Sequence, residues 1–166
     1  MQTHEQVSVK EYLAASYRPD CDYVDGIVKE RNMGEWDHGR IQARLVSFFF
    51  SRERRNGIRV VPEQRIQVKP TRFWVADVCV VTGAEPGEQV LTHPPFICIE
   101  ILSREQSISD MRERVKDYLE FGVPHVWILD PKLFQAWQCT PGQTRQVTEL
   151  TTKVPAITVP LEEIFD

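Results

Sequence analysis

Two acidic side chains interrupt apolar stretches of this 166-residue sequence. Asp77 lies within the stretch 74–81, and Glu100 lies within the stretch 96–102. An unpaired charge in such surroundings costs several kcal/mol, so a buried carboxylate is normally paired or bound to a metal ion. Each of the two acids therefore needs a partner that the local sequence does not supply.

The two acidic segments follow each other across one loop, residues 83–95, which is rich in glycine and proline. They are therefore expected to be neighbours in a sheet. Two carboxylates brought together raise each other's pKa unless a cation lies between them. Oxygen ligands of this kind suit Mg²⁺ or Mn²⁺, which lowers the pKa of a bound water and neutralises a phosphate oxygen. Asp77 and Glu100 thus predict a site for metal-assisted hydrolysis.

Such a site would also use a positive side chain to orient the attacking water. Lys116 lies on a helix predicted directly after the Glu100 strand, next to apolar Val115, and we predict that it fills this role. The alternative is a solvent-facing helix surface, because Arg112 and Glu120 lie four residues to either side of Lys116.

Alternating helices and strands must position these residues. Helices are predicted at 8–15, 38–56 and 107–122, and strands at 23–30, 58–69, 74–81, 96–102, 123–129, 133–139 and 145–150. Asp37 is expected to cap the second helix and Gly57 to end it. The apolar tail, 154–165, is expected to pack on the body or on a second subunit. The order predicts an α/β fold, a mixed central sheet flanked by helices.

Composition describes an ordinary globular chain. Its length fits a single domain, 1–166, and a net charge of −4 excludes a uniformly basic surface but not a local basic groove. The four cysteines form no CxxC pair, which argues against zinc and redox motifs. No stretch approaches the roughly 20 apolar residues of a membrane span. We expect a cytoplasmic protein with reduced thiols.

Several motifs occur together in one order along the chain. They are Asp77, the Glu-Ile-Leu-Ser run at 100–103, Asp110 and Lys116 on one helix, Tyr118, Gly-Val at 122–123, and Val-Trp-Ile-Leu-Asp-Pro at 126–131. In this order they resemble the Uma-type restriction endonuclease family, which belongs to the PD-(D/E)XK nuclease superfamily. The acidic strand and turn at 22–26 and His38 extend the resemblance, which covers about 7–165.

The resemblance implies a restriction-endonuclease-like fold. It also implies that Asp77 and Glu100 are metal ligands, together with the backbone carbonyl of Ile101. Leu102 stands where the superfamily usually has its lysine, and Lys116 matches the position to which this family has moved it. Ala76 replaces the proline of the motif, which changes a backbone preference but not a ligand.

Accessory roles are possible for four further residues: Asp22, His38, Glu63 and Asp110. Three of them also have a structural interpretation. His38 could cap or pack, Asp110 could interact with a helix dipole, and Glu63 could lie on the surface. The two principal acids also have a structural interpretation, since Asp77 could form a hydrogen bond with a neighbouring loop and Glu100 could pair with Arg65 or Lys69.

Five arginines form a basic stripe on the second predicted helix: Arg40, Arg44, Arg52, Arg54 and Arg55. They could solubilise the helix, or they could contact phosphates, in which case Arg40 and Arg44 would touch DNA.

The leading hypothesis is a Mg²⁺- or Mn²⁺-dependent endonuclease that cuts DNA, expected to be a homodimer because two subunits suit double-strand cutting. The alternative is a catalytically inactive module that keeps the fold and binds nucleic acid or protein.

Overall fold

The computed structural model describes residues 5–166; residues 1–4 of the expected domain lie outside the described residues. The helical elements are α1 (Val9–Ala14), α2 (Trp36–Phe50), α3 (Glu53–Asn56), the 3₁₀ turn η1 (Ile108–Met111), α4 (Arg112–Phe121) and α5 (Leu161–Ile164). The strands are β1 (Asp22–Val24), β2 (Ile27–Lys29), β3 (Ile58–Lys69), β4 (Arg72–Thr82), β5 (Ile97–Ile101), β6 (His125–Asp130), β7 (Gln135–Thr140), β8 (Gln143–Val147), β9 (Glu149–Thr151) and β10 (Thr158–Pro160).

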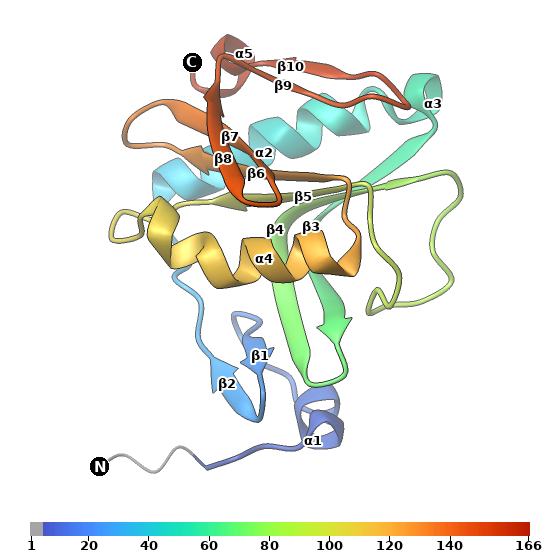
Figure 1. Cartoon of the computed structure of the whole chain (residues 1–166), viewed down its shortest axis with the longest axis vertical. Helices are drawn as coiled ribbons and strands as arrows, with labels where there is room; N and C mark the ends of the chain where they lie inside the picture. The colour runs from blue at the N-terminus through green and yellow to red at the C-terminus, as the bar shows by residue number, and fades with distance from the viewer. Residues whose placement is uncertain (1–4) are drawn as a thin grey trace.

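One sheet of eight strands forms the centre of the molecule. Its order is β2-β1-β4-β5-β6-β7-β8, and β3 pairs with β4. Only β5 and β6 run parallel; the other pairs in this sheet are antiparallel. Figure 1 shows α4 in front of the sheet, whereas α2 covers the other side next to α5. This is the predicted α/β class, a mixed sheet with flanking helices.

Each face of the sheet has its own apolar core. The core under α2 contains Leu45 and Phe49 of that helix and also the tail residues Ile157, Val159 and Ile164. The tail therefore packs on the body of its own chain, one of the two alternatives that the sequence left open. On the opposite face, α4 buries its apolar stripe against β5, β6 and β7.

Most element boundaries agree with expectation, but the second helix differs at both ends. It begins at Trp36, and Asp37 lies in its first turn and does not cap it. It ends at Phe50, and a separate turn, α3, follows before Gly57. Gly57 closes α3 as predicted, with a φ of 64° that suits glycine. Within residues 5–166, no helix is long and apolar enough to cross a membrane.

Candidate active site

The central sheet forks along one edge of β4. That edge pairs with β1 at Arg72 and Phe73 and with β5 from Val78 to Val80. Between these two regions the edge of β4 has no strand partner, so the sheet opens there. Buried backbone amides in such an opening need other acceptors.

Two carboxylates supply these acceptors. Oδ1 of Asp22 accepts a hydrogen bond from the backbone N–H of Val75 at 2.8 Å, and Oδ2 of Asp77 accepts one from the N–H of Ile101 at 2.7 Å. Asp22 and Asp77 are 2% and 4% exposed. The fork in the sheet therefore explains why buried acids are tolerated at these positions.

Three acids lie in one row across the neighbouring strands β3, β4 and β5. Pairing between β4 and β5 ends at Val78 and Ile99, and one further step along the register places Asp77 opposite Glu100. On the other edge, the ladder between β3 and β4 skips Glu63 and Asp77, and Glu63 has a φ of 54°. The sequence prediction that the two acidic strands are neighbours is thus confirmed.

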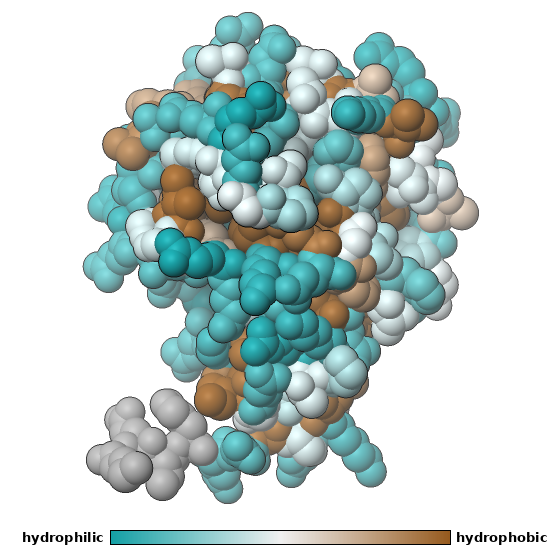
Figure 2. Space-filling model, viewed as in Figure 1, coloured by the Kyte–Doolittle hydropathy of each residue, from teal (hydrophilic) through white to brown (hydrophobic). Residues whose placement is uncertain are grey.

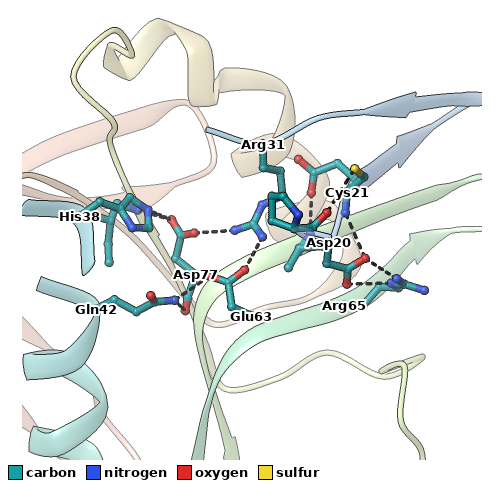
Figure 3. Close-up of polar contacts among 12 residues, drawn as sticks. Asp20, Cys21, Arg31, His38, Gln42, Glu63, Arg65 and Asp77 are labelled. Atoms are coloured by element: carbon teal, nitrogen blue, oxygen red, sulfur yellow. Dashed lines mark hydrogen bonds and ion pairs between the residues drawn. The ribbon is translucent and has the colours of Figure 1, made fainter. Parts of the chain in front are cut away.

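Asp77 contacts the side chains of Arg31 and His38. Its Oδ1 accepts a hydrogen bond from Arg31 at 2.6 Å, and Nε2 of His38 lies 3.3 Å from its Oδ2 (Figure 3). Burial alone would raise the pKa of Asp77, but His38, Arg31 and the N–H of Ile101 together hold this pKa below its usual value. Burial likewise would lower the pKa of His38, and Asp77 and Glu63 raise it above its usual value.

Glu63 joins helix α2 to this site. Its carboxylate accepts hydrogen bonds from Arg31 and from Nε2 of Gln42, the latter at 2.7 Å. The same Gln42 nitrogen donates to the carbonyl of Asp77 at 2.8 Å (Figure 3). Glu63 therefore belongs to the site and not to the free surface.

Glu100 is 2% exposed and faces helix α4. Its Oε1 accepts a hydrogen bond from the Tyr118 hydroxyl at 2.7 Å, and its Oε2 accepts one from Arg114 at 3.0 Å. Burial, with a further contribution from the charge of Asp77, raises the pKa of Glu100 to about 8, since Arg114 and Tyr118 offset it only in part. A cation close to Glu100 would favour its ionised form.

Arg114 connects the two sides of the fork. It donates to Oδ2 of Asp22 at 2.7 Å as well as to Glu100, and its side chain is 12% exposed. Burial alone would lower the pKa of its guanidinium, but Glu100 and Asp22 raise this pKa. The group therefore stays charged, and it also lies 4.7 Å from the centre of the Trp74 ring.

The cluster holds more acids than permanent cations. Asp22, Glu63, Asp77 and Glu100 supply four carboxylates, whereas Arg31 and Arg114 supply two guanidinium groups. A small cavity of about 70 Å³ opens between them, lined by both arginines, by Asp22, Asp77 and Glu100, and by Ile101 and His38.

The donor set fits a hard divalent ion in type and in charge, because Mg²⁺ needs one or two carboxylates and keeps several waters. Each oxygen of Glu100 and Oδ1 of Asp77 makes one hydrogen bond, so each keeps a lone pair. Within residues 5–166, however, no three His, Cys, Asp or Glu side chains are already grouped as a ligand set. Since the arginines line the same cavity, a metal ion would have to share it with them.

The structure does not bring Lys116 to this cluster. Its side chain is 72% exposed and its Nζ lies 3.8 Å from Glu120. A helix advances about 100° per residue, so residues two positions apart face nearly opposite directions, and the inward direction of Arg114 turns Lys116 outward. The geometry therefore supports the alternative interpretation, in which Lys116 lies on a solvent-facing surface of the helix.

Three further expectations are corrected. Asp110 lies outside the cluster, because its carboxylate accepts hydrogen bonds from Ser107 in a capping box. Arg44 donates to the backbone carbonyls of Ile164 and Asp166, which gives it a structural role in holding the tail.

Glu100 pairs with Arg114 and not with Arg65 or Lys69, the structural partners that the sequence offered. Arg65 pairs with Asp20, and Lys69 pairs with Asp117 and Glu120. Arg40 is exposed on α2.

Sequence reasoning missed Arg31 and Arg114. Arg114 follows Met111 by three residues and precedes Tyr118 by four, so it lies on the apolar stripe of α4. A charged residue on such a stripe is a signal that could have identified it. Arg31 lies in an irregular segment after β2, where no periodicity indicates which way a side chain points.

Comparisons with known proteins agree with this architecture. The model of the Uma2 family, described as "Putative restriction endonuclease", matches residues 9–166. A crystal structure of a protein from Anabaena variabilis ATCC 29413, titled a putative nuclease belonging to DUF820, has a TM-score of 0.80 and 20% sequence identity, and the alignment covers 96% of this chain and 97% of that one. This likeness establishes a shared fold. The search of curated proteins found no match.

Proposed function

Since the chain belongs to the Uma2 family, we propose that it is a metal-dependent endonuclease that hydrolyses phosphodiester bonds in DNA. The observation that carries the proposal is the group of three buried carboxylates, Asp22, Asp77 and Glu100, that share two arginines at the fork of the sheet. Asp77 and Glu100, with the backbone carbonyl of Ile101, would hold Mg²⁺ or Mn²⁺. The bound ion would supply an activated water and charge neutralisation at a phosphate oxygen.

The other residues of the cluster hold and orient these ligands. Arg31 and His38 contact Asp77, and Gln42 and Glu63 connect that contact to helix α2. Tyr118 orients Glu100 through its hydroxyl. Arg114 is a second, permanent cation beside Glu100, suited to stabilising charge that develops on a phosphate. We assign to Arg114 the role that the sequence suggested for Lys116.

The test is nicking of supercoiled plasmid with Mg²⁺ or Mn²⁺. Asp77→Asn and Glu100→Gln are each expected to lower the rate at least about 100-fold, because each removes a charged metal ligand. Asp117→Asn is the matched control: it neutralises another buried acid, which contacts Arg72, Trp74 and Lys69 and none of the acids of the cluster, and it should retain the rate per folded molecule. Equal cleavage by the wild type and both site variants would identify a contaminating nuclease and defeat the proposal.

One observation favours a second candidate, a binding module without catalysis. Both principal acids already contact arginines, so the site has counter-charges of its own. Salt-sensitive DNA binding with no cleavage in any divalent metal would support this candidate. Calorimetric binding of Mn²⁺ that disappears in Glu100→Gln would count against it.

A homodimer remains part of the proposal, because two sites are needed to cut both strands of a duplex at once. The tail packs on its own chain, so it is not the first candidate for the interface. Light scattering of the full chain would measure the mass of the assembly.

The four cysteines are buried and free, which suits the reducing cytoplasm that we propose as the location of this protein.

A further inference from the structure

A second pocket adjoins the carboxylate cluster. Its volume is about 220 Å³, and its lining includes Trp36, His38, Leu102, Arg104 and Lys132. His38 also lines the cavity that holds Asp77 and Glu100, and Ile101 of that cavity directly precedes Leu102. The two hollows are therefore neighbours that share His38 as part of their walls.

Trp36 is the distinctive residue of this pocket. It is 79% exposed, whereas Trp74, Trp127 and Trp137 are 4%, 1% and 8% exposed. Burial of a tryptophan is strongly favoured, so a ring left in water at the mouth of a polar site points to a ligand with a flat apolar face.

Two cations, Arg104 and Lys132, line the same pocket as Trp36. Lys132 is held in place because its Nζ donates to the carbonyls of Ser103 and Gln106, both at 2.9 Å, and Oδ1 of Asp130 lies 3.7 Å away; the third ammonium proton makes no hydrogen bond within residues 5–166. Arg104 is exposed, and its backbone N–H donates to Glu35 at 2.9 Å. Two acids, Glu35 and Asp37, also line the pocket, which disfavours a bare anion as its ligand.

We propose that this pocket binds one unpaired nucleobase of DNA, stacked on Trp36, with the adjoining phosphates on Arg104 and Lys132. A base inside a duplex has both faces covered by its neighbours, so only an unpaired or extruded base can offer a face to the ring. This inference rests on the proposed nuclease function and narrows it: the substrate is single-stranded DNA or DNA with an unpaired nucleotide next to the cleaved bond.

The test measures binding in EDTA, where cleavage does not interfere. A single-stranded oligothymidylate should quench the fluorescence of Trp36, the one tryptophan that is largely exposed among residues 5–166. With binding measured by the fluorescence anisotropy of a dye-labelled oligothymidylate, Trp36→Ala should weaken binding about 10-fold, and Trp36→Phe should restore most of the affinity because phenylalanine also stacks. Phe50→Ala is the matched control, since Phe50 is 66% exposed at the other end of the same helix.

The outcomes separate this inference from the proposed function. Cleavage that requires Asp77, together with equal binding by wild type and Trp36→Ala, would overturn the inference and leave the function standing. Loss of binding in Trp36→Ala for a wild type that cuts nothing would support the inference and defeat the function. Equal quenching by a blunt duplex would also overturn the requirement for an unpaired base.

Discussion

Two buried acidic centres in this molecule differ in their balance of charge. Asp117 of α4 is 1% exposed and accepts hydrogen bonds from the Trp74 indole at 2.8 Å and from Arg72, and it lies 3.2 Å from Lys69. This one buried carboxylate thus has two cations and a neutral donor, and the other acids that share these cations, Asp25 and Glu120, are about half exposed to water. At the fork of the sheet, four carboxylates share two arginines.

The difference shows how a structural ion pair can be told from a candidate metal site. The Asp117 centre satisfies its acid completely, so it needs nothing from outside the chain. The cluster around Asp77 and Glu100 keeps a surplus of negative charge in a buried place, which only an added cation or a proton can neutralise. Burial raises the pKa of Glu100 to about 8, and the charge of the nearby Asp77 adds to this effect.

Arg114→Gln is expected to have the largest effect on stability. It leaves Asp22 and Glu100 buried without their shared cation, which should cost about 3 kcal/mol of unfolding free energy in urea. Mg²⁺ should recover part of this loss, because the added ion neutralises the same acids. Lys116→Gln, two residues away and exposed, should stay within about 0.5 kcal/mol of the wild type. A variant that Mg²⁺ leaves unstabilised would argue against a metal site.

Asp117→Asn tests the balanced centre. The amide can still accept a hydrogen bond from Trp74 but no longer attracts Arg72 and Lys69, so we expect a loss of about 2 kcal/mol in urea unfolding. Mg²⁺ should stabilise this variant as much as it stabilises the wild type. If the mutation abolished the response to Mg²⁺, the two centres would not be independent.

The pH dependence of thermal unfolding should depend on Glu100. Its folded pKa is raised from 4.5 to about 8, so the folded chain binds more protons than the unfolded chain between these values. Stability from this group is therefore lost as the pH rises from about 4.5 towards 8. In EDTA, the wild-type Tm should fall by roughly 5 °C over this interval, and by less in Glu100→Gln. Identical pH profiles of Tm in the wild type and in Glu100→Gln would show that Glu100 does not cause this pH dependence.

The smallest effect is expected for Arg44→Gln, a control outside both acidic centres. It removes hydrogen bonds from α2 to the carbonyls of Ile164 and Asp166, so stability should fall by about 0.5–1 kcal/mol. DNA binding should keep its salt dependence. A reduced salt slope would instead restore Arg44 as a phosphate contact.

The sequence was informative where a residue contradicts its local pattern. Asp77 and Glu100 stand out because each interrupts an apolar strand, and the register of β4 and β5 does place them opposite one another. Lys116 did not contradict its surroundings, since charged neighbours at helical spacing are normal on an exposed face. Arg114 did interrupt the apolar stripe of α4. The rule that identified Asp77 and Glu100, a charged residue in an apolar pattern, would therefore have favoured Arg114 over Lys116.

By itself, then, the sequence determined the α/β class, most elements and the two principal acids, because periodicity and apolar runs are local properties of a chain. The tertiary structure alone decided which cations face those acids. Arg31 comes from an irregular segment, Arg114 from a helix, and Asp22 from a short strand, and each reaches the site only because the sheet forks at β4. The surplus of charge is a property of that assembly, since no single segment contains it.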